Sequence, residues 1–218
     1  MASALKTLFN HITRVEALTP THQIYGEYVK RIQLKYGYHD DHVMAVYLSH
    51  HRALELALQY CRQNSQPFAL IMEDDVSFDF TLFWSGAFDS YLTKLPANWA
   101  TIQLGYTRGK IDPLNGHVPR YEVPVRPGFY KGSHYGAFAY LINTNGLELI
   151  LNRSMDTVKA GCEYMTSDDC LLPFAPSLNI RRAHPLSDRN YFIAPPLFGV
   201  NIDATPSHRK GHDKEFSL

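Results

Sequence analysis

Three consecutive acidic residues, Glu73, Asp74 and Asp75, are the part of the sequence best suited to chemistry. They follow a short apolar run at residues 67–72. Like charges this close repel one another, so such a cluster calls for a compensating cation. Carboxylate oxygens suit Mg²⁺ or Mn²⁺, which favour sites shared with substrate phosphates. Because alternate residues can face one ion, Glu73 and Asp75 are candidate metal ligands. The alternative is a solvated acidic turn that caps the next helix.

Helices and strands are expected to alternate around these acidic residues. Apolar residues at steps of three and four predict a helix over 41–64. The continuous apolar run at 67–72 is typical of a buried strand in a parallel sheet covered by helices. Beyond it we expect a helix over 81–95, strands over 99–105, 137–142 and 178–182, a long loop over 106–130 and a helix over 145–151.

This alternation predicts one α/β domain over residues 1–218, a Rossmann-like sandwich with a mainly parallel central sheet flanked by helices. Ligands of such sheets bind at the carboxyl ends of the strands. We therefore expect Glu73 to Asp75 to follow a central strand at a ligand-binding edge. Residues 203–218 read as a polar tail.

Composition narrows the class of protein. Hydrophobic residues make up 45% of the 218 residues and charged residues 19%, which indicates a globular chain. Lys and Arg number 21, as do Asp and Glu, so the net charge is zero and gives no case for nucleic acid or an anionic membrane surface. The three cysteines favour reduced thiols, and no apolar run reaches the length of a membrane span. We expect a cytoplasmic protein without a transmembrane segment.

Two segments, Val46–Leu54 and Ala69–Val76, together resemble motifs of glycosyltransferase family 25, which includes lipooligosaccharide and collagen galactosyltransferases. Its members carry a helix with the pattern YLSHxxA and, about 20 residues later, a strand with the pattern LEDDV. The family's opening strand has no counterpart here, and the similarity extends from about residue 9 to 197. Weaker similarities lie at Thr13–Leu18, Ile102–Gly105, Gly136–Ile142 with Gly146, Ser167–Leu171 and Arg189–Leu197.

The resemblance implies a GT-A fold and the transfer of a hexose, such as galactose or glucose, from a UDP-sugar with inversion. The acceptor would be a hydroxyl of a glycan or a lipid-linked oligosaccharide. Glu73 and Asp75 would hold Mn²⁺ or Mg²⁺. Four residues are expected on the donor side: Ser49, His50, Arg52 and Asp74. His50 lies on the apolar face of its helix, where a core histidine is the alternative interpretation.

Two other functions suit the same residues. One is a metal-dependent phosphohydrolase built on Glu73 to Asp75, which would need further ligands at neighbouring strand ends. The other is an inactive transferase fold that binds carbohydrate or acts as a scaffold. Transfer or hydrolysis of the donor with Mn²⁺ separates the enzyme from the scaffold.

Inverting transfer also needs a base that is distant from the metal motif. The resemblance places Asp168 and Asp169 there, although either Ser167 or Asp168 can equally cap a helix. We predict that Asp169→Asn, or failing that Asp168→Asn, keeps donor binding and lowers transfer by about a hundredfold or more, because a general base is lost. Turnover and binding should be measured on both variants. Near-normal transfer in both would place the base elsewhere.

Overall fold

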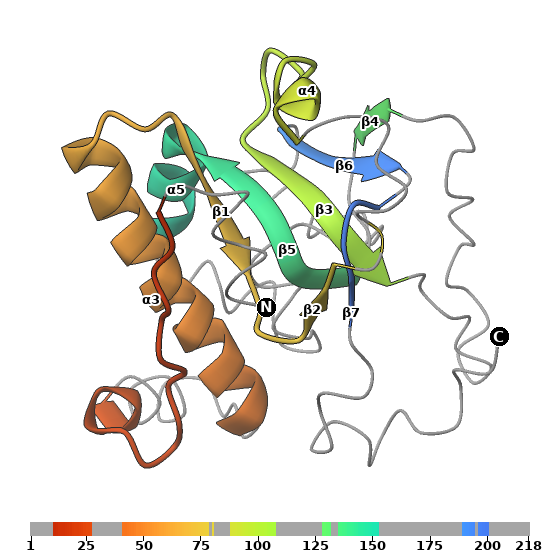
Figure 1. Ribbon diagram of the computed structural model, residues 1–218. Helices are drawn as coiled ribbons and strands as arrows, with labels where there is room; N and C mark the ends of the chain where they lie inside the picture. The colour runs from red at the N-terminus through yellow and green to blue at the C-terminus, as the bar shows by residue number, and fades with distance from the viewer. Residues whose placement is uncertain are drawn as a thin grey trace, which may run out of the picture.

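The computed structural model describes residues 11–27, 41–78, 80, 88–107, 128–131, 135–152, 189–194 and 196–200 (Figure 1). The expected strand at 178–182 and the polar tail at 203–218 lie outside these residues, as does most of the expected loop at 106–130. The labelled helices are α3 (Asp41–Gln63), α4 (Phe88–Leu92) and α5 (Thr144–Leu151), and residues 23–27 are helical as well. The strands are β1 (Phe68–Met72), β2 (Val76–Ser77), β3 (Thr101–Thr107), β4 (Gly128–Lys131), β5 (Tyr135–Asn143), β6 (Asn190–Ala194) and β7 (Gly199–Val200).

Five of the strands form a mixed sheet in the order β1-β5-β3-β6-β4. Only the β3–β6 pair is parallel, whereas β1–β5, β3–β5 and β4–β6 are antiparallel. The α/β class is confirmed, but the prediction of a mainly parallel sheet is wrong for the described strands. The prediction of a central position for β1 is also wrong, because β1 is the outermost of these strands on its side.

The apolar run of β1 has a different cause from the one expected. Ile71 faces the core shared with α3 and α5, whereas Leu70 and Met72 pack against the core on the other face of the sheet. A strand covered on both faces is apolar throughout, whatever the direction of its partner. The run therefore predicted burial correctly and carried no information on whether the pairing is parallel.

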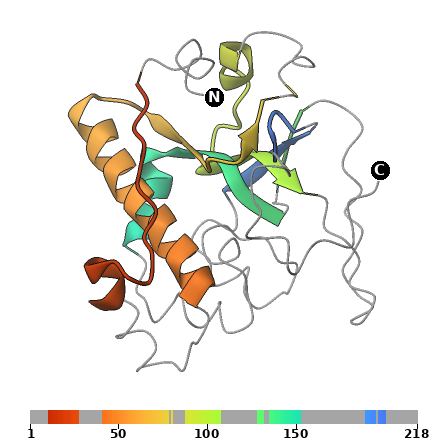
Figure 2. The ribbon, with the colours of Figure 1, turned by 60° about the horizontal axis from the view of Figure 1, so that its bottom comes forward.

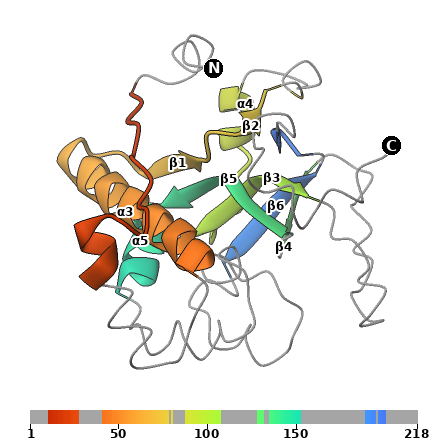
Figure 3. The ribbon, with the colours of Figure 1, turned by 90° about the horizontal axis from the view of Figure 1, so that it is seen from below.

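Two hydrophobic cores lie on opposite faces of the sheet. Figure 3 shows α3 and α5 on one face and α4 on the other. Tyr140 and Ile142 of β5 belong to the first core, and Ala139 and Leu141 belong to the second. This alternation follows from the two-residue period of a strand.

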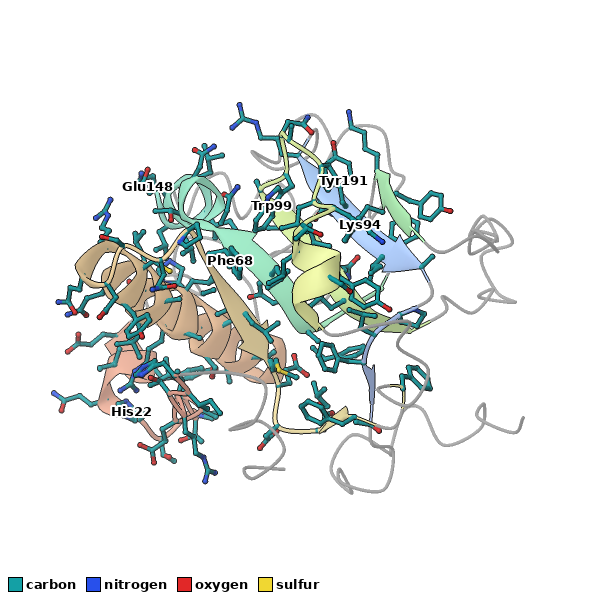
Figure 4. All side chains as sticks on the ribbon, turned by 45° about the horizontal axis from the view of Figure 1, so that its top comes forward. His22, Phe68, Lys94, Trp99, Glu148 and Tyr191 are labelled. Carbon is teal, nitrogen blue, oxygen red and sulfur yellow. The ribbon has the colours of Figure 1, made fainter. Side chains whose placement is uncertain are left out.

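Aromatic side chains fill much of the second core. The rings of Phe68 and Trp99 meet edge to face, with centroids 5.9 Å apart (Figure 4). Tyr191 of β6 donates a hydrogen bond from its hydroxyl to the Asn98 side chain.

Among the described helices, none combines the length and the apolar stretch that crossing a bilayer requires.

The N-terminal segment 11–27 runs along α3 (Figure 2). Its residues 11–19 have no regular secondary structure, so the strand that the resemblance implied at Thr13–Leu18 is not formed. Leu18 and Tyr25 are buried in the core beneath α3, and the ring of His11 stacks on Tyr60 with centroids 4.1 Å apart. These contacts hold the N-terminal segment against α3 and add to the core on that face of the sheet.

Helix α3 ends in a tight turn that places Ser65 in a left-handed conformation, with φ of 52°. The backbone N–H of Gln66 donates to the carbonyl of Cys61 at 2.9 Å, and that of Asn64 donates to Tyr60 at 3.0 Å. The first of these bonds spans the six residues typical of a Schellman cap, whose left-handed position glycine normally occupies. Ser65 is exposed, so its side chain contributes no burial to offset the strain.

We predict that Ser65→Gly raises the free energy of unfolding by about 0.5 to 1 kcal/mol, because glycine adopts this φ without a Cβ clash. Urea unfolding followed by circular dichroism measures the change. Ser65→Ala is the control, since it removes the hydroxyl and keeps the clash. An equal gain in both variants would contradict the explanation.

Gly105 permits a close approach between β3 and β5. A Cβ added to it would lie 2.2 Å from Cε2 of Phe138. The β3–β5 register shifts on both sides of Gly105, as it does at a β-bulge. The backbone N–H of Glu73 donates to the carbonyl of the same Phe138 at 2.8 Å. The close approach therefore lies beside the acidic residues.

We predict that Gly105→Ala lowers the free energy of unfolding by about 1 to 3 kcal/mol, because the ring of Phe138 must move to admit a methyl group. Gly26→Ala is the control: nothing lies within 4 Å of the Cβ it would add, and Gly26 lies in a helical stretch, so its stability should stay equal or rise by up to about 1 kcal/mol. Urea unfolding of both variants checks this. A free energy of unfolding for Gly105→Ala equal to that of the wild type would show that the Phe138 ring moves aside without loss of stability.

Candidate functional site

The acidic residues form the turn between β1 and β2, at one edge of the main sheet. Strands β1 and β3 are both antiparallel to β5, and β6 is parallel to β3, so β1, β3 and β6 point the same way. Their carboxyl ends share one edge of the sheet, although β5 separates β1 from β3 and β6. The expected placement at the carboxyl end of a strand is therefore confirmed, on an outer rather than a central strand.

Backbone contacts fix this acidic turn on both sides. Before it, Glu73 N–H donates to Phe138 of β5. After it, β2 pairs with β7, with Val76 opposite Val200. The segment leading into β7 is tied to β3, because the N–H of Leu197 donates to the carbonyl of Leu104 at 2.7 Å. Three segments distant in sequence therefore meet at the turn.

The three carboxylates differ in exposure. Asp74 is exposed, whereas Glu73 and Asp75 are intermediate, with 32% of the Glu73 side chain accessible. Within the described residues, no group of three or more His, Cys, Asp and Glu side chains is placed to hold a metal ion. Two carboxylates fit the way Mg²⁺ and Mn²⁺ are usually bound, since these ions take one or two protein carboxylates together with phosphate oxygens.

A buried histidine contacts the first of these carboxylates. Nε2 of His50 lies 2.9 Å from Oε1 of Glu73, and Nδ1 of the same ring lies 3.3 Å from the hydroxyl of Tyr140. His50 is 6% exposed and Tyr140 is completely buried. Both ring nitrogens of His50 therefore contact protein groups. This interior placement matches the alternative of a core histidine, and donor contact by His50 stays a prediction.

Ser49 has a structural contact on each side. Its hydroxyl donates to the carbonyl of Ala45 at 2.7 Å and accepts the N–H of Leu18 at 2.8 Å. Ser49 thus fastens the N-terminal segment to α3. The side chain of Arg52 is intermediate in exposure and forms no ion pair with any acidic group that the structure describes. Donor binding by Ser49, Arg52 and Asp74 stays a prediction.

The next residue along α3, His51, contacts a different carboxylate. Nδ1 of His51 lies 3.4 Å from Oε1 of Glu55, one turn further along α3. Burial lowers the pKa of His51, and the nearby Glu55 carboxylate partly opposes this. His50 and His51 are therefore adjacent in sequence, but His50 contacts Glu73 and Tyr140 whereas His51 contacts Glu55.

Tyr140 is the residue that the sequence did not single out for the site. A tyrosine inside a strand buried on both faces needs a partner for its hydroxyl, and this requirement is the signal that could have identified it.

The proposed bases Asp168 and Asp169 lie outside the described residues. No protein-family model matches the chain, and no curated protein matches it significantly. The resemblance to glycosyltransferase family 25 accordingly stays an expectation from sequence.

Proposed function

We propose that the protein is a metal-dependent glycosyltransferase that transfers a hexose from a UDP-sugar to a hydroxyl of a glycan or lipid-linked oligosaccharide. The observation that carries the proposal is the pair Glu73 and Asp75 in a turn at the edge where β1, β3 and β6 end. Carboxylates at such an edge are where α/β proteins bring a cation and a phosphate ligand together. The motif resemblance of Val46–Leu54 and Ala69–Val76 supports the choice of a sugar donor.

The three residues of the acidic turn would have different roles. Glu73 and Asp75 would hold Mn²⁺ or Mg²⁺ against the donor diphosphate, while the exposed Asp74 would face the rest of the donor. When bound, such an ion neutralises the charge that develops on a departing diphosphate. The carboxylates would also orient the diphosphate, because their own backbone is fixed by β1 and by the β2–β7 pair.

The acceptor hydroxyl must lose its proton on the opposite face of the sugar. The carboxylates of the acidic turn cannot serve there, since they lie on the leaving-group side. Asp169, or failing that Asp168, is the base that we propose, on the strength of the sequence resemblance. The GT-A fold and inversion at the anomeric carbon belong to the same proposal.

We predict that UDP binding requires a divalent ion and Asp75. Without the ion, the diphosphate would meet uncompensated carboxylates. Calorimetry with UDP and Mn²⁺ should show binding by the wild-type protein, and EDTA should abolish it. Asp75→Ala should weaken binding by about tenfold or more, because one of two protein ligands is lost.

Glu55→Ala is a suitable control, since Glu55 is a carboxylate on α3 with 56% of its side chain exposed. It removes one negative charge without touching the acidic turn. Metal-independent UDP binding, or equal affinity in Asp75→Ala and wild type, would refute the metal role. Hydrolysis of simple phosphate esters with Mn²⁺, without sugar transfer, would favour the phosphohydrolase instead.

A further inference from the structure

A chain of three polar side chains, of which the first two are buried, leads from the interior of the sheet to the acidic turn. Tyr140 lies on β5, His50 on α3 and Glu73 directly after β1. The imidazole ring lies between the other two groups, 3.3 Å from the hydroxyl and 2.9 Å from the carboxylate oxygen. Because the three residues come from different elements, tertiary packing alone brings them together.

The chemistry of the groups sets the direction of the hydrogen bonds. A carboxylate only accepts, so Nε2 of His50 carries the hydrogen and donates it to Oε1 of Glu73. In the neutral ring Nδ1 then accepts the hydrogen of the Tyr140 hydroxyl. This arrangement satisfies both ring nitrogens of His50 at once, which favours one orientation of the ring.

The surroundings make that orientation rigid. His50 lies at 6% exposure and Tyr140 at 0%, and Tyr140 belongs to the core that includes Leu54 and Ile142. The two rings lie 6.1 Å apart at an interplanar angle of 21°. A close-packed interior restrains both rings to single rotamers. The hydrogen bond from Nε2 therefore acts on Glu73 from a fixed point.

Glu73 is partly exposed, and the described residues hold only one of its two carboxylate oxygens. Its Oε1 accepts from His50, whereas its Oε2 accepts no hydrogen bond from any residue that the structure describes. The side chain is 32% exposed. A partly exposed carboxylate with one oxygen bonded to a buried histidine has the form of a pre-oriented metal ligand, because ligating carboxylates are usually held by an outer hydrogen bond.

We propose that His50 and Tyr140 are positioning residues, which hold the Glu73 carboxylate in the orientation that binds the divalent cation. This inference rests on the proposed metal role of Glu73. It gives the buried histidine a function through Glu73 and requires no contact between His50 and the donor.

Two substitutions at His50 separate positioning from simple core packing. The amide nitrogen of Gln reaches the place of Nε2, whereas that of Asn reaches only the place of Nδ1. Both replace an imidazole by a smaller amide. We expect His50→Gln to keep Mn²⁺-dependent UDP binding near the wild-type affinity, and His50→Asn to weaken it by about tenfold or more.

Calorimetry with Mn²⁺ and UDP, and titration with Mn²⁺ alone, give readouts that are independent of transfer. Tyr140→Phe keeps the ring and removes only the hydroxyl, so it carries the test if His50→Asn does not fold. We expect it to weaken Mn²⁺ binding as well, because His50 then loses the bond that fixes its ring. His51→Gln and His51→Asn are the matched controls at the next position, where affinity should not change.

The outcomes separate this inference from the proposed function. If Glu73→Ala leaves Mn²⁺ and UDP binding unchanged, the metal role of Glu73 is refuted, and the positioning role is refuted with it. If Glu73→Ala abolishes binding while His50→Asn and Tyr140→Phe bind normally, only the positioning role is overturned. Equal weakening by His50→Gln and His50→Asn, in proportion to their loss of stability towards urea, would reduce His50 to a packing residue.

Discussion

Strand β5 pairs with β1 along one edge and with β3 along the other, and its side chains from Phe138 to Ile142 are almost entirely shielded from solvent. The backbone groups of such a strand have no access to water, so both ladders must form together. The ladder to β1 ends at Ala139, opposite Met72, and the N–H of Glu73 continues it to Phe138. The position of the acidic turn is thus a consequence of the β5 register.

The same strand connects the site to both cores. Ala139 and Leu141 face the core beneath α4, and Tyr140 faces α3, where it meets His50. A shift of the β5 register by one residue would exchange these faces and remove the hydroxyl from the histidine. The mixed sheet therefore brings the carboxyl ends of β1, β3 and β6 to one edge, as a parallel sheet would. In addition, the antiparallel strand β5 places the Tyr140 side chain next to His50, behind the Glu73 carboxylate.

Local patterns were enough to predict several elements. The three and four residue spacing gave α3, which the structure places at Asp41–Gln63, close to the expected 41–64. The apolar runs predicted β1 and most of β3 and β5, and the helix expected at 145–151 is α5. Of the helix expected at 81–95, the structure describes α4 at Phe88–Leu92. These predictions succeeded because burial on one face or on both leaves its period in the chain itself.

By itself, the sequence predicted α3, β1, α5 and most of β3 and β5, together with the burial of β1 and the acidic residues that end it. It did not predict β2, β4, β6 or β7, and the expected loop over 106–130 runs into β4. It could not determine strand direction, because a strand buried on both faces is apolar in parallel and antiparallel sheets alike. Nor could it show that Ser49 secures Leu18, or that His50 joins Tyr140 to Glu73. These contacts join residues 31, 90 and 23 positions apart, and only tertiary packing brings such residues within hydrogen-bond distance.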